Sequence, residues 1–390
     1  MPGTALLVLN SGSSSLKFAV FAADRGGVQP LYSGEAEGIG TDEGRSWVRG
    51  GDGRALSDER RAIPEQAEAI RVVAETLARL TFPPLAGIGH RVVHGGPALR
   101  EHQLITPQVL AQLEAAVQFA PLHVPTALVL IREAERHFAS VPQFACFDTA
   151  FHRTLPEAAA RFALPEKFWQ AGVRRYGFHG LSCESILYTL GGEAPPRMIV
   201  AHLGNGASIT AIAGGLSVDT TMGLTPTGGI VMGTRPGDLD PGVLLYLWRV
   251  SGGGSEEMEK IVDTKSGLLG ISGISGDMRR LHEAGKDPRA RLAIEMFSRT
   301  ARKAIGSFVA ILGGLDLLVF TGGIGEHDGA VRAQICAGLE CLGIVLDAGA
   351  NQASQRIISA AGSRVRVSIL PSEEEAQIAR HVTRLLGADV

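Results

Sequence analysis

The chain has few cysteines, little net charge and no long apolar run, and each shortage excludes a class of protein. Its four cysteines, Cys146, Cys183, Cys336 and Cys341, lack the spacing of zinc or redox sites. We expect them to pack in the interior, and their low number suits a reducing cytoplasm. The net charge of -3 gives no general attraction to nucleic acid or to an anionic membrane. No apolar run approaches the roughly 18 residues of a membrane helix, and the absence of a basic leader predicts no signal peptide.

Glycine, in contrast, is abundant, with 50 residues in 390. Three turns rich in small residues follow apolar runs: "NSGSSS", with Ser11, Ser13–Ser15 and then Lys17; "GNGAS" at 204–208; and "FTGGIGEH" at 320–327. Backbone N–H groups in such turns form nests for anions. The latter two match neither the P-loop nor the GxGxxG pattern. One serine-rich turn alone is more simply a solvated hairpin, but three together favour a triphosphate held from several sides.

Strand-like and helix-like segments alternate along the chain, which predicts an α/β fold. Residues 6–21 and 198–213 both read as strand, small polar turn and strand, with Asn10 and Asn205 in the turns. We therefore predict two duplicated domains with a nucleotide cleft between them. The first spans residues 1–150 and is completed by a C-terminal helix at about 375–390. The second spans residues 151–374.

Several segments have clear local patterns. The local pattern predicts an exposed hairpin or loop at 41–59 and a helix at 64–80. It predicts buried strands at 85–96 and 141–152. Residues 315–327 predict a strand, a glycine turn and a helix. Ser372 and Glu375 have capping-box spacing at the start of the final helix.

Five charged or titratable residues stand beside glycines or at element ends: Arg91, Asp148, His179, Arg235 and Glu374. Arginine binds carboxylate or phosphate bidentately, and carboxylates facing phosphates usually hold Mg²⁺. The alternative for each is structural: a surface charge for an arginine, a helix-dipole partner for an acid, or a packed histidine. The residues alone leave these alternatives open.

In order along the chain, "NSGSSSLKF", "GHRVVHGG", "FDTAFH", "RYGFHG", "HLGNGAS", "MGTRPGD", "KSGLLGISG", "FTGGIGEH" and "PSEEE" resemble segments of the acetate kinases. The resemblance covers nearly the whole chain. It implies two actin-like (ribonuclease H-like) domains and reversible phosphorylation of acetate by ATP. It also implies Mg²⁺, with Mn²⁺ as an alternative metal, and a cytoplasmic homodimer without nucleic-acid or membrane partners.

The resemblance also implies roles for single residues. The catalytic set is Asp148, His179, Arg235 and Arg91, and the metal ligands are Asn10 and Glu374. The acetate pocket comprises Arg91, Val93, Leu122, Phe178 and Pro226. The nucleotide and phosphate contacts are Lys17, His202, Leu203, Gly204, Asn205, Gly206, Gly323, Ile324 and Gly325.

The chain departs from the family's usual residues at Thr227, Gly228, Gly276 and Glu373, and Thr227 and Gly228 directly follow the pocket residue Pro226. Two alternatives stay open. A propionate or butyrate kinase keeps the reaction, but Val93 argues against larger acids. A non-catalytic or filament-forming actin-like ATPase would lack the two arginines at the acceptor.

Overall fold

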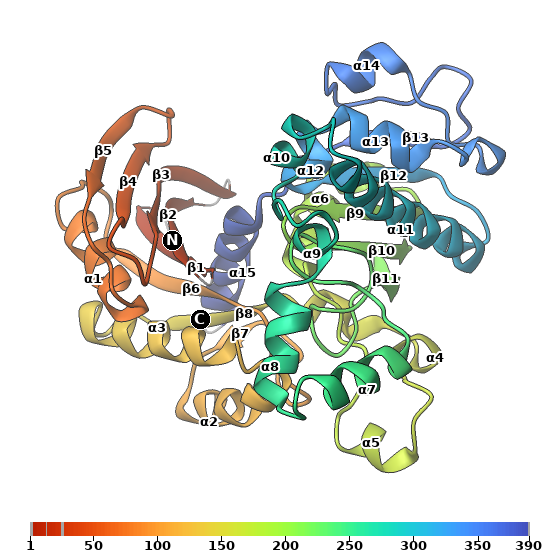
Figure 1. Cartoon of the computed structure of the whole chain (residues 1–390). Helices are drawn as coiled ribbons and strands as arrows, with labels where there is room; N and C mark the ends of the chain where they lie inside the picture. The colour runs from red at the N-terminus through yellow and green to blue at the C-terminus, as the bar shows by residue number, and fades with distance from the viewer. Residues whose placement is uncertain (1–2, 13, 25–26, 389–390) are drawn as a thin grey trace. The chain divides into compact units, whose positions relative to one another are not determined.

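The structure is a computed structural model that describes residues 3–12, 14–24 and 27–388, so Ser13 lies outside the described residues. The chain divides into two compact units (Figure 1). Unit 1 comprises residues 1–150 and 373–390, and unit 2 comprises residues 151–372. Among the described residues, no helix combines the length and apolar character that crossing a membrane requires.

Unit 1 is built on an eight-stranded sheet in the order β5-β4-β3-β2-β1-β6-β8-β7. Its strands are β1 (Thr4–Ser11), β2 (Ser15–Asp24), β3 (Gly27–Glu37), β4 (Arg45–Gly50), β5 (Ala55–Arg60), β6 (Leu85–Val92), β7 (Gln103–Leu104) and β8 (Gln143–Phe147). Its helices are α1 (Gln66–Leu77), α2 (Pro107–Ala116), the 3₁₀ turn Val117–Phe119, α3 (Val124–His137) and α15 (Glu374–Ala388). The pair β4 and β5 forms the hairpin predicted for 41–59, and α1 is the helix predicted for 64–80.

Unit 2 is built on a five-stranded sheet in the order β11-β10-β9-β12-β13. Its strands are β9 (Arg197–Leu203), β10 (Ala207–Ala213), β11 (Leu216–Thr220), β12 (Leu317–Thr321) and β13 (Arg366–Ile369). Its helices are α4 (Glu157–Ala160), α5 (Glu166–Gln170), α6 (Gly180–Leu190), α7 (Pro241–Val250), α8 (Ser255–Glu259), α9 (Gly267–Ser272), α10 (Met278–Glu283), α11 (Pro288–Leu312), α12 (Gly322–His327), α13 (Gly329–Cys336) and α14 (Ala348–Gln352). Shorter turns are Ala150–Thr154, Gly191–Glu193, Lys260–Thr264 and Glu340–Leu342.

The two sheets repeat one plan. In unit 1, β1 pairs antiparallel with β2, which pairs antiparallel with β3, while β6 and β8 continue parallel on the other side. In unit 2, β9, β10 and β11 stand in the same relation, and β12 and β13 continue parallel. The predicted α/β class with two duplicated domains is confirmed, and the two strand–turn–strand segments are the equivalent hairpins β1–β2 and β9–β10.

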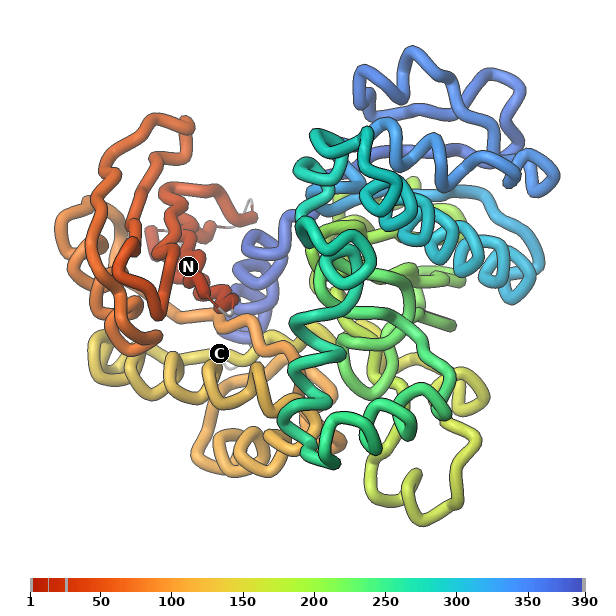
Figure 2. The backbone as a smooth tube through the Cα atoms, in the orientation of Figure 1, coloured from red at the N-terminus to blue at the C-terminus, as the bar shows by residue number. Residues whose placement is uncertain are grey.

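Helix α15 belongs to the first unit although it follows the second along the chain. It packs on β1 and β6 (Figure 2). Glycine in β6 makes that contact close: a Cβ at Gly89 would lie 2.4 Å from Ile378 Cγ2, and one at Gly87 would lie 3.0 Å from Val382 Cγ1. The glycines therefore set how near the start of α15, with Glu374 and Glu375, comes to the sheet.

Candidate functional site

In unit 1, three site residues lie where the parallel strands β1, β6 and β8 end. Asn10 is the penultimate residue of β1, Arg91 the penultimate residue of β6, and Asp148 directly follows β8. Strand β8 is buried at all five positions, and Asp148 is only 1% exposed. Since carboxyl ends of parallel strands share one edge of a sheet, ligands commonly bind there. The structure brings these three predicted residues into direct contact.

Arg91 is the centre of this cluster. Its Nε and Nη2 donate to the two carboxylate oxygens of Asp148 at 3.0 and 2.6 Å, and its Nη1 donates to Asn10 Oδ1 at 3.1 Å. Its Nε also lies 3.9 Å from Glu374 Oε2. Burial by itself would lower the pKa of the guanidinium, but Asp148 and Glu374 hold that pKa above its ordinary value. Arg91 is therefore a buried, oriented cation and not a surface charge.

The acidic side of the cluster comes from the start of α15. Glu375 Oε1 accepts a hydrogen bond from Asn10 Nδ2 at 3.0 Å. Glu374 is largely buried, and this burial raises its pKa to about 7, with Asp148 and Glu375 adding to the rise and Arg91 and Lys17 opposing it. Three carboxylates thus face two cations. This excess of oxygen ligands and negative charge fits a divalent cation such as Mg²⁺.

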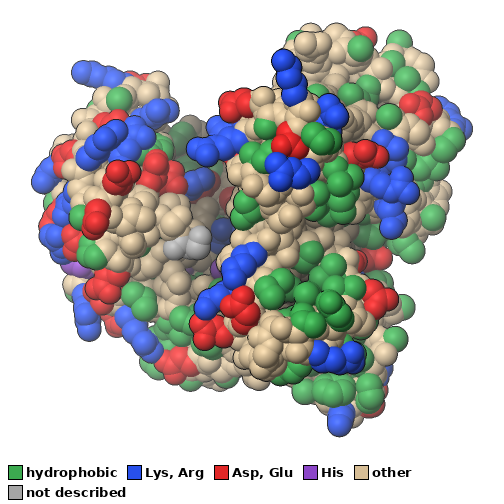
Figure 3. All heavy atoms as spheres, in the orientation of Figure 1, with side chains coloured by type: hydrophobic (Ala, Val, Ile, Leu, Met, Phe, Trp, Pro, Cys, Tyr) green, Lys and Arg blue, Asp and Glu red, His purple; other side chains and the backbone are tan. Residues whose placement is uncertain are grey.

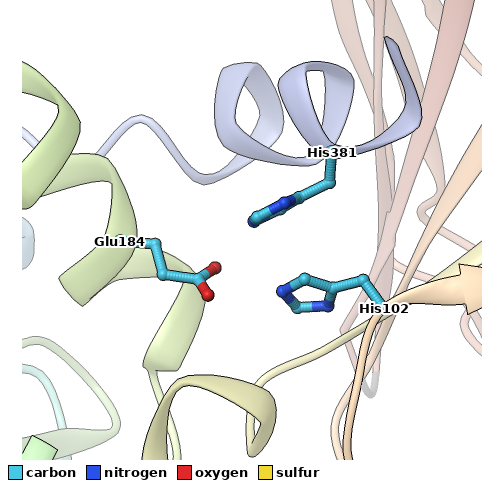
Figure 4. A group of neighbouring side chains, drawn as sticks. All are labelled: His102, Glu184 and His381. Carbon is cyan, nitrogen blue, oxygen red and sulfur yellow. The ribbon is translucent and has the colours of Figure 1, made fainter. Parts of the chain in front are cut away.

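Two histidines link the end of β8 to α15 (Figure 4). His102 Nδ1 accepts a hydrogen bond from the backbone N–H of Phe147, the residue before Asp148, at 3.0 Å. The ring of His102 faces that of His381 in α15, with ring centroids 4.0 Å apart. His381 Nε2 also bonds to Gln377 at 3.0 Å. These contacts connect the residue before Asp148 with the middle of α15.

A small pocket adjoins Arg91 within unit 1. Its lining residues are Ser11, Gly12, Arg91, Val93, Leu122, His123, Thr126 and Ala127. Its cavity volume is about 10 Å³, close to the least that admits a water molecule. Val93 and Leu122, both predicted pocket residues, line it, and Leu122 is 51% exposed.

Lys17 is exposed on β2 and pairs with Asn10 in the β1–β2 ladder.

In unit 2, the predicted histidines lie ring on ring. His179, just before α6, and His202, in β9, stack with centroids 4.1 Å apart. His179 Nδ1 bonds to Ser208 Oγ at 3.0 Å, and His202 Nδ1 to Ser182 Oγ at 2.9 Å. His179 has a φ of 56°, a left-handed conformation that is uncommon outside glycine. When Ser208 donates to Nδ1, the neutral ring of His179 carries its proton on Nε2.

The β9–β10 turn, Gly204 to Gly206, lies beside His179 and Arg235. A Cβ at Gly206 would stand 2.8 Å from Arg235 Nη2 and 3.3 Å from His179 Nε2, so glycine is needed for this approach. Arg235 Nη1 also donates to the Pro226 carbonyl at 2.6 Å. The structure therefore groups four predicted features: His179, the glycine turn, Arg235 and Pro226.

Phe178, predicted to line the acetate pocket, is 1% exposed, and its carbonyl bonds to His152 Nε2 at 2.9 Å. Its side chain lies in the interior of unit 2. The pocket role of Phe178 stays a prediction.

The second glycine turn of this unit forms the first turn of α12. Gly322 has a φ of 77°, and a Cβ there would lie 2.8 Å from the carbonyl oxygen of Leu203, the last residue of β9. Glu326 Oε1 accepts hydrogen bonds from the N–H groups of Gly322 and Ser372 at 2.9 and 3.3 Å. The turn that contains Gly323, Ile324 and Gly325 is thus held against the neighbouring strand.

Sequence reasoning missed several partners. Glu375 was assigned to a capping box, yet its Oε1 bonds to Asn10. Ser208 and Ser182, which orient the two histidines, had no assigned role. Cys341 is exposed, so the expectation that all four cysteines pack inside is wrong for it, while the other three are buried. Ser182 follows Leu181 and Ser208 follows Ala207, and neither stretch has a local pattern that identifies the serine.

The unusual residues also have visible roles. Thr227 Oγ1 makes a short hydrogen bond to Asp263. A Cβ at Gly276 would lie 2.9 Å from the Gly233 carbonyl, so glycine permits this close backbone approach. Glu373 pairs with Arg380 at 3.4 Å along α15 and is 51% exposed.

Comparison with known proteins agrees with this arrangement. The sequence profile of the acetokinase family matches residues 5–380. The acetate kinase of Nitrobacter hamburgensis is 44% identical over 392 residues, covering 98% of this chain and 96% of that protein. Among solved structures, Porphyromonas gingivalis acetate kinase has a TM-score of 0.87 at 36% identity and covers 98% of this chain and 100% of its own. A propionate kinase from Francisella tularensis has a TM-score of 0.89, also at 36% identity, with coverages of 97% and 98%.

Similarity across nearly the whole length of both chains places this protein among the ATP-dependent phosphotransferases that use a carboxyl group as acceptor. The chain belongs to the acetokinase family. The resemblance drawn from the ordered motifs is confirmed, and a non-catalytic actin-like ATPase is set aside.

Proposed function

We propose that the protein transfers the γ-phosphoryl group of ATP to acetate, reversibly forming acetyl phosphate and ADP. The observation that carries this proposal is the orientation of Arg91 beside the small pocket. Of its five N–H groups, three are engaged by Asp148 and Asn10. Among residues 3–12, 14–24 and 27–388, the other N–H of Nη1 and the other N–H of Nη2 have no hydrogen-bond partner, and a guanidinium suits a bidentate carboxylate. The adjoining pocket, lined by Val93 and Leu122, would take the methyl group.

The reaction needs no general base, because a carboxylate is already ionised at neutral pH, unlike a sugar hydroxyl. Phosphoryl transfer depends mostly on positioning and charge stabilisation. In our proposal Arg91 orients the acid and Asp148 orients Arg91. Arg235 and the Nε2–H of His179 stabilise the equatorial oxygens in an in-line transition state.

The nucleotide contacts are assigned to the glycine turns. Gly204–Gly206 and Lys17 contact phosphate oxygens, together with His202 and Leu203 of β9. The turn of Gly323, Ile324 and Gly325 takes the adenosine side. Support comes from the close backbone approaches at Gly206 and Gly322, which leave no room for a Cβ.

Mg²⁺ completes the proposal. Asn10 and Glu374 would hold Mg²⁺. They would also hold Mn²⁺, since both metals prefer oxygen ligands. When bound, the ion would neutralise charge on the leaving phosphates. Removing divalent metal with a chelator should abolish turnover, and adding Mg²⁺ should restore it. Full activity in the presence of excess chelator would contradict this assignment.

Hydroxamate trapping of acyl phosphate tests the function directly. Protein, ATP and Mg²⁺ are incubated with acetate, propionate or butyrate in parallel, and we expect the highest kcat/KM with acetate. Preference for propionate would support the alternative suggested by the Francisella tularensis enzyme. Folded protein that forms no acyl phosphate with any of the acids would refute the kinase assignment.

We also propose that the protein is a homodimer in the cytoplasm. Every residue of α7 is at least partly exposed, and its exposed apolar residues include Leu245 (59%), Tyr246 (61%) and Trp248 (45%). Figure 3 shows hydrophobic side chains gathered over this helix. Monomers rarely expose such patches. Arg249 is the one charged residue of α7. Two copies related by a twofold axis can therefore pack their α7 helices together without burying other charged residues of this helix.

The proposal of a cytoplasmic location is supported by the cysteines. All four are free thiols, which is typical of a reducing compartment.

Light scattering after size-exclusion chromatography tests the dimer. We expect the wild type to have twice the chain mass, and Leu245→Glu with Tyr246→Glu to have the mass of one chain. Tyr188→Glu, at a comparably exposed aromatic of α6 (58%), is the matched control and should stay dimeric. A monomeric wild type would refute the proposal.

A further inference from the structure

Arg332 in α13 is completely buried, yet it is not paired with an acid. It is 0% exposed. Within the described ranges, its side chain makes no ion pair. The nearest influential acid, Asp328, accepts a hydrogen bond from the N–H of Val331 at 3.0 Å and pairs with His282 at 2.7 Å. Burial lowers the pKa of the Arg332 guanidinium, which Asp328 partly opposes. Hydrogen bonds must therefore compensate for the cost of burying this charge.

All of those hydrogen bonds go to neutral acceptors. Nη1 donates to the Gly325 carbonyl at 2.9 Å. Nε donates to Asn351 Oδ1 at 2.8 Å, and Nη2 donates to the Asn351 carbonyl at 2.6 Å and to Ser354 Oγ at 3.0 Å. One guanidinium thus connects the end of the glycine turn in α12 with α14. A fixed planar fork suits this task in a way that a lysine ammonium does not.

Asn351 completes the network. It is 5% exposed, and its Nδ2 donates to the Gly329 carbonyl, at the start of α13, at 2.8 Å. A cavity of about 620 Å³ lies along α13 and α14, and the small residues Ala330, Ala333 and Ala348 are among those that line it. Apolar packing between the two helices is therefore limited, and the polar network carries much of the attachment.

The glycine turn is consequently held from both sides. Glu326 binds the N–H of Gly322 at its beginning, and Arg332 binds the Gly325 carbonyl at its end. We propose that Arg332 and Asn351 are positioning residues that fix the Gly322–Gly325 turn in the shape that accepts the nucleotide. This inference rests on the proposed adenosine-side role of that turn. A turn released from Arg332 would sample other shapes, and nucleotide affinity would fall in proportion to the competent fraction.

The test separates nucleotide binding from turnover. Calorimetric titration of ADP into each variant gives Kd without a reaction, and steady-state kinetics give KM for ATP and acetate. We expect Arg332→Met to raise the Kd for ADP and the KM for ATP about tenfold or more. KM for acetate should change less than twofold, because the acid pocket residues Val93 and Leu122 lie outside this network.

Arg302→Met is the matched control. Arg302, in α11, donates to the carbonyls of Ile335 and Gln334 at the other end of α13, so it anchors the same helix without touching the turn. We expect its Kd for ADP to stay within twofold of the wild type. If the Kd for ADP rose equally in both arginine variants, Arg332 would only stabilise α13 in general, and the inference would be overturned.

Asn351 variants decide the matter if Arg332→Met does not fold. Asn351→Asp keeps the acceptor for Arg332 Nε but loses the donor to the Gly329 carbonyl, so it should lose less ADP affinity than Asn351→Ala, which removes both bonds and should lose affinity severalfold. Equal ADP affinity in folded Asn351→Ala and wild type would overturn the inference. The wild type is first tested for acyl phosphate formation, so failure of the proposed function is seen separately: an inactive wild type refutes the kinase, not the network.

Discussion

The five-stranded sheet of unit 2 has the strand order of β3-β2-β1-β6-β8 in the larger sheet of unit 1, but the strand ends of the two units carry different chemistry. In unit 1, β1, β6 and β8 end in an ionic cluster of Asn10, Arg91 and Asp148, joined by acids of α15. In unit 2, the equivalent strands β9 and β12 end in glycine turns, and the stacked rings of His179 and His202 lie beside the first of them. Topology decides where functional side chains gather, and the side chains decide what binds there.

The difference has a physical basis. In unit 1, Arg91, Asp148 and Glu374 are largely buried and interact with one another, which orients a cation for an acid and leaves oxygen ligands for a metal. In unit 2, the absence of side chains lets Gly206 approach Arg235 and His179 and lets Gly322 approach the Leu203 carbonyl, while the Gly322 N–H is held by Glu326. We therefore assign the acid and the metal to unit 1, and the phosphates and adenosine chiefly to unit 2.

The largest expected effect comes from comparing the two arginines. Arg91→Ala and Arg235→Ala should each lower kcat/KM by roughly 10²–10³-fold, the usual result of losing a preorganised donor to a transition-state anion. They should differ in stability. Arg91→Ala leaves the buried Asp148 carboxylate unpaired, which costs roughly 3–5 kcal/mol, whereas Arg235 donates to a neutral carbonyl, and a hydrogen bond from a charged donor is worth roughly 1.5–3 kcal/mol.

Stability of unit 1 can be followed through Trp47 alone in a background of Trp169→Phe and Trp248→Phe, because those are the other two tryptophans. Urea unfolding monitored by the fluorescence of Trp47 should show a lower free energy of unfolding for Arg91→Ala than for the wild type. Normal turnover by either folded arginine variant would show that arginine to be dispensable.

A smaller loss is expected at His179. His179→Ala should lower kcat by about 10²-fold and change KM for acetate little, because the proposed contact strengthens only in the transition state. Ser208→Ala, which removes the partner of Nδ1, should have the same signature at lower amplitude. A raised KM with unchanged kcat would instead make His179 a ground-state binding residue.

Specificity should respond to Val93 in unit 1. A pocket too short for one methylene discriminates by roughly 10–200-fold, so the wild type should prefer acetate to propionate. Val93→Ala should narrow or invert that preference, mainly by raising kcat/KM for propionate. Val129→Ala, the same change at an exposed position of α3 (39%), should leave the ratio unchanged. An equal effect of Val93→Ala on both acids would place Val93 in the core.

The smallest effect concerns acid sensitivity of unit 1. Burial lowers the pKa of His90 from 6.5 to about 4, although its hydrogen bond to Gln143 opposes this. The unfolded chain therefore binds a proton that the folded chain does not, and stability is lost as pH falls below 6.5. Between pH 7 and 5.5 the wild type should lose about 1 kcal/mol more than His90→Asn, measured through Trp47. Equal losses would show that His90 is protonated without penalty.

Much of this arrangement was predictable from local patterns. The repeated strand–turn–strand segments predicted the duplicated sheets, and the glycine turns after apolar runs indicated the candidate phosphate-binding residues. Partners distant in sequence were not predictable: Asn10 meets Glu375 across 365 positions, and nothing near either residue signals the contact. Capping-box spacing even favoured a different role for Glu375. Arg332 was missed because a buried arginine bonded to carbonyls resembles any helical arginine in sequence.

The return of the chain to unit 1 at Glu373 also determines an order of events during biosynthesis. Arg91 and Asp148 are synthesised before residues 151–372, while Glu374, Glu375 and the rest of α15 are synthesised after them. At ~5–20 residues per second, β6, with the glycines at 87 and 89 that receive α15, waits roughly 15–55 s for its covering helix, because β6 ends at Val92 and α15 begins at Glu374. Unit 2 can complete its own sheet in that interval, so we expect nascent chains to acquire the nucleotide-side turns before the acid-side cluster.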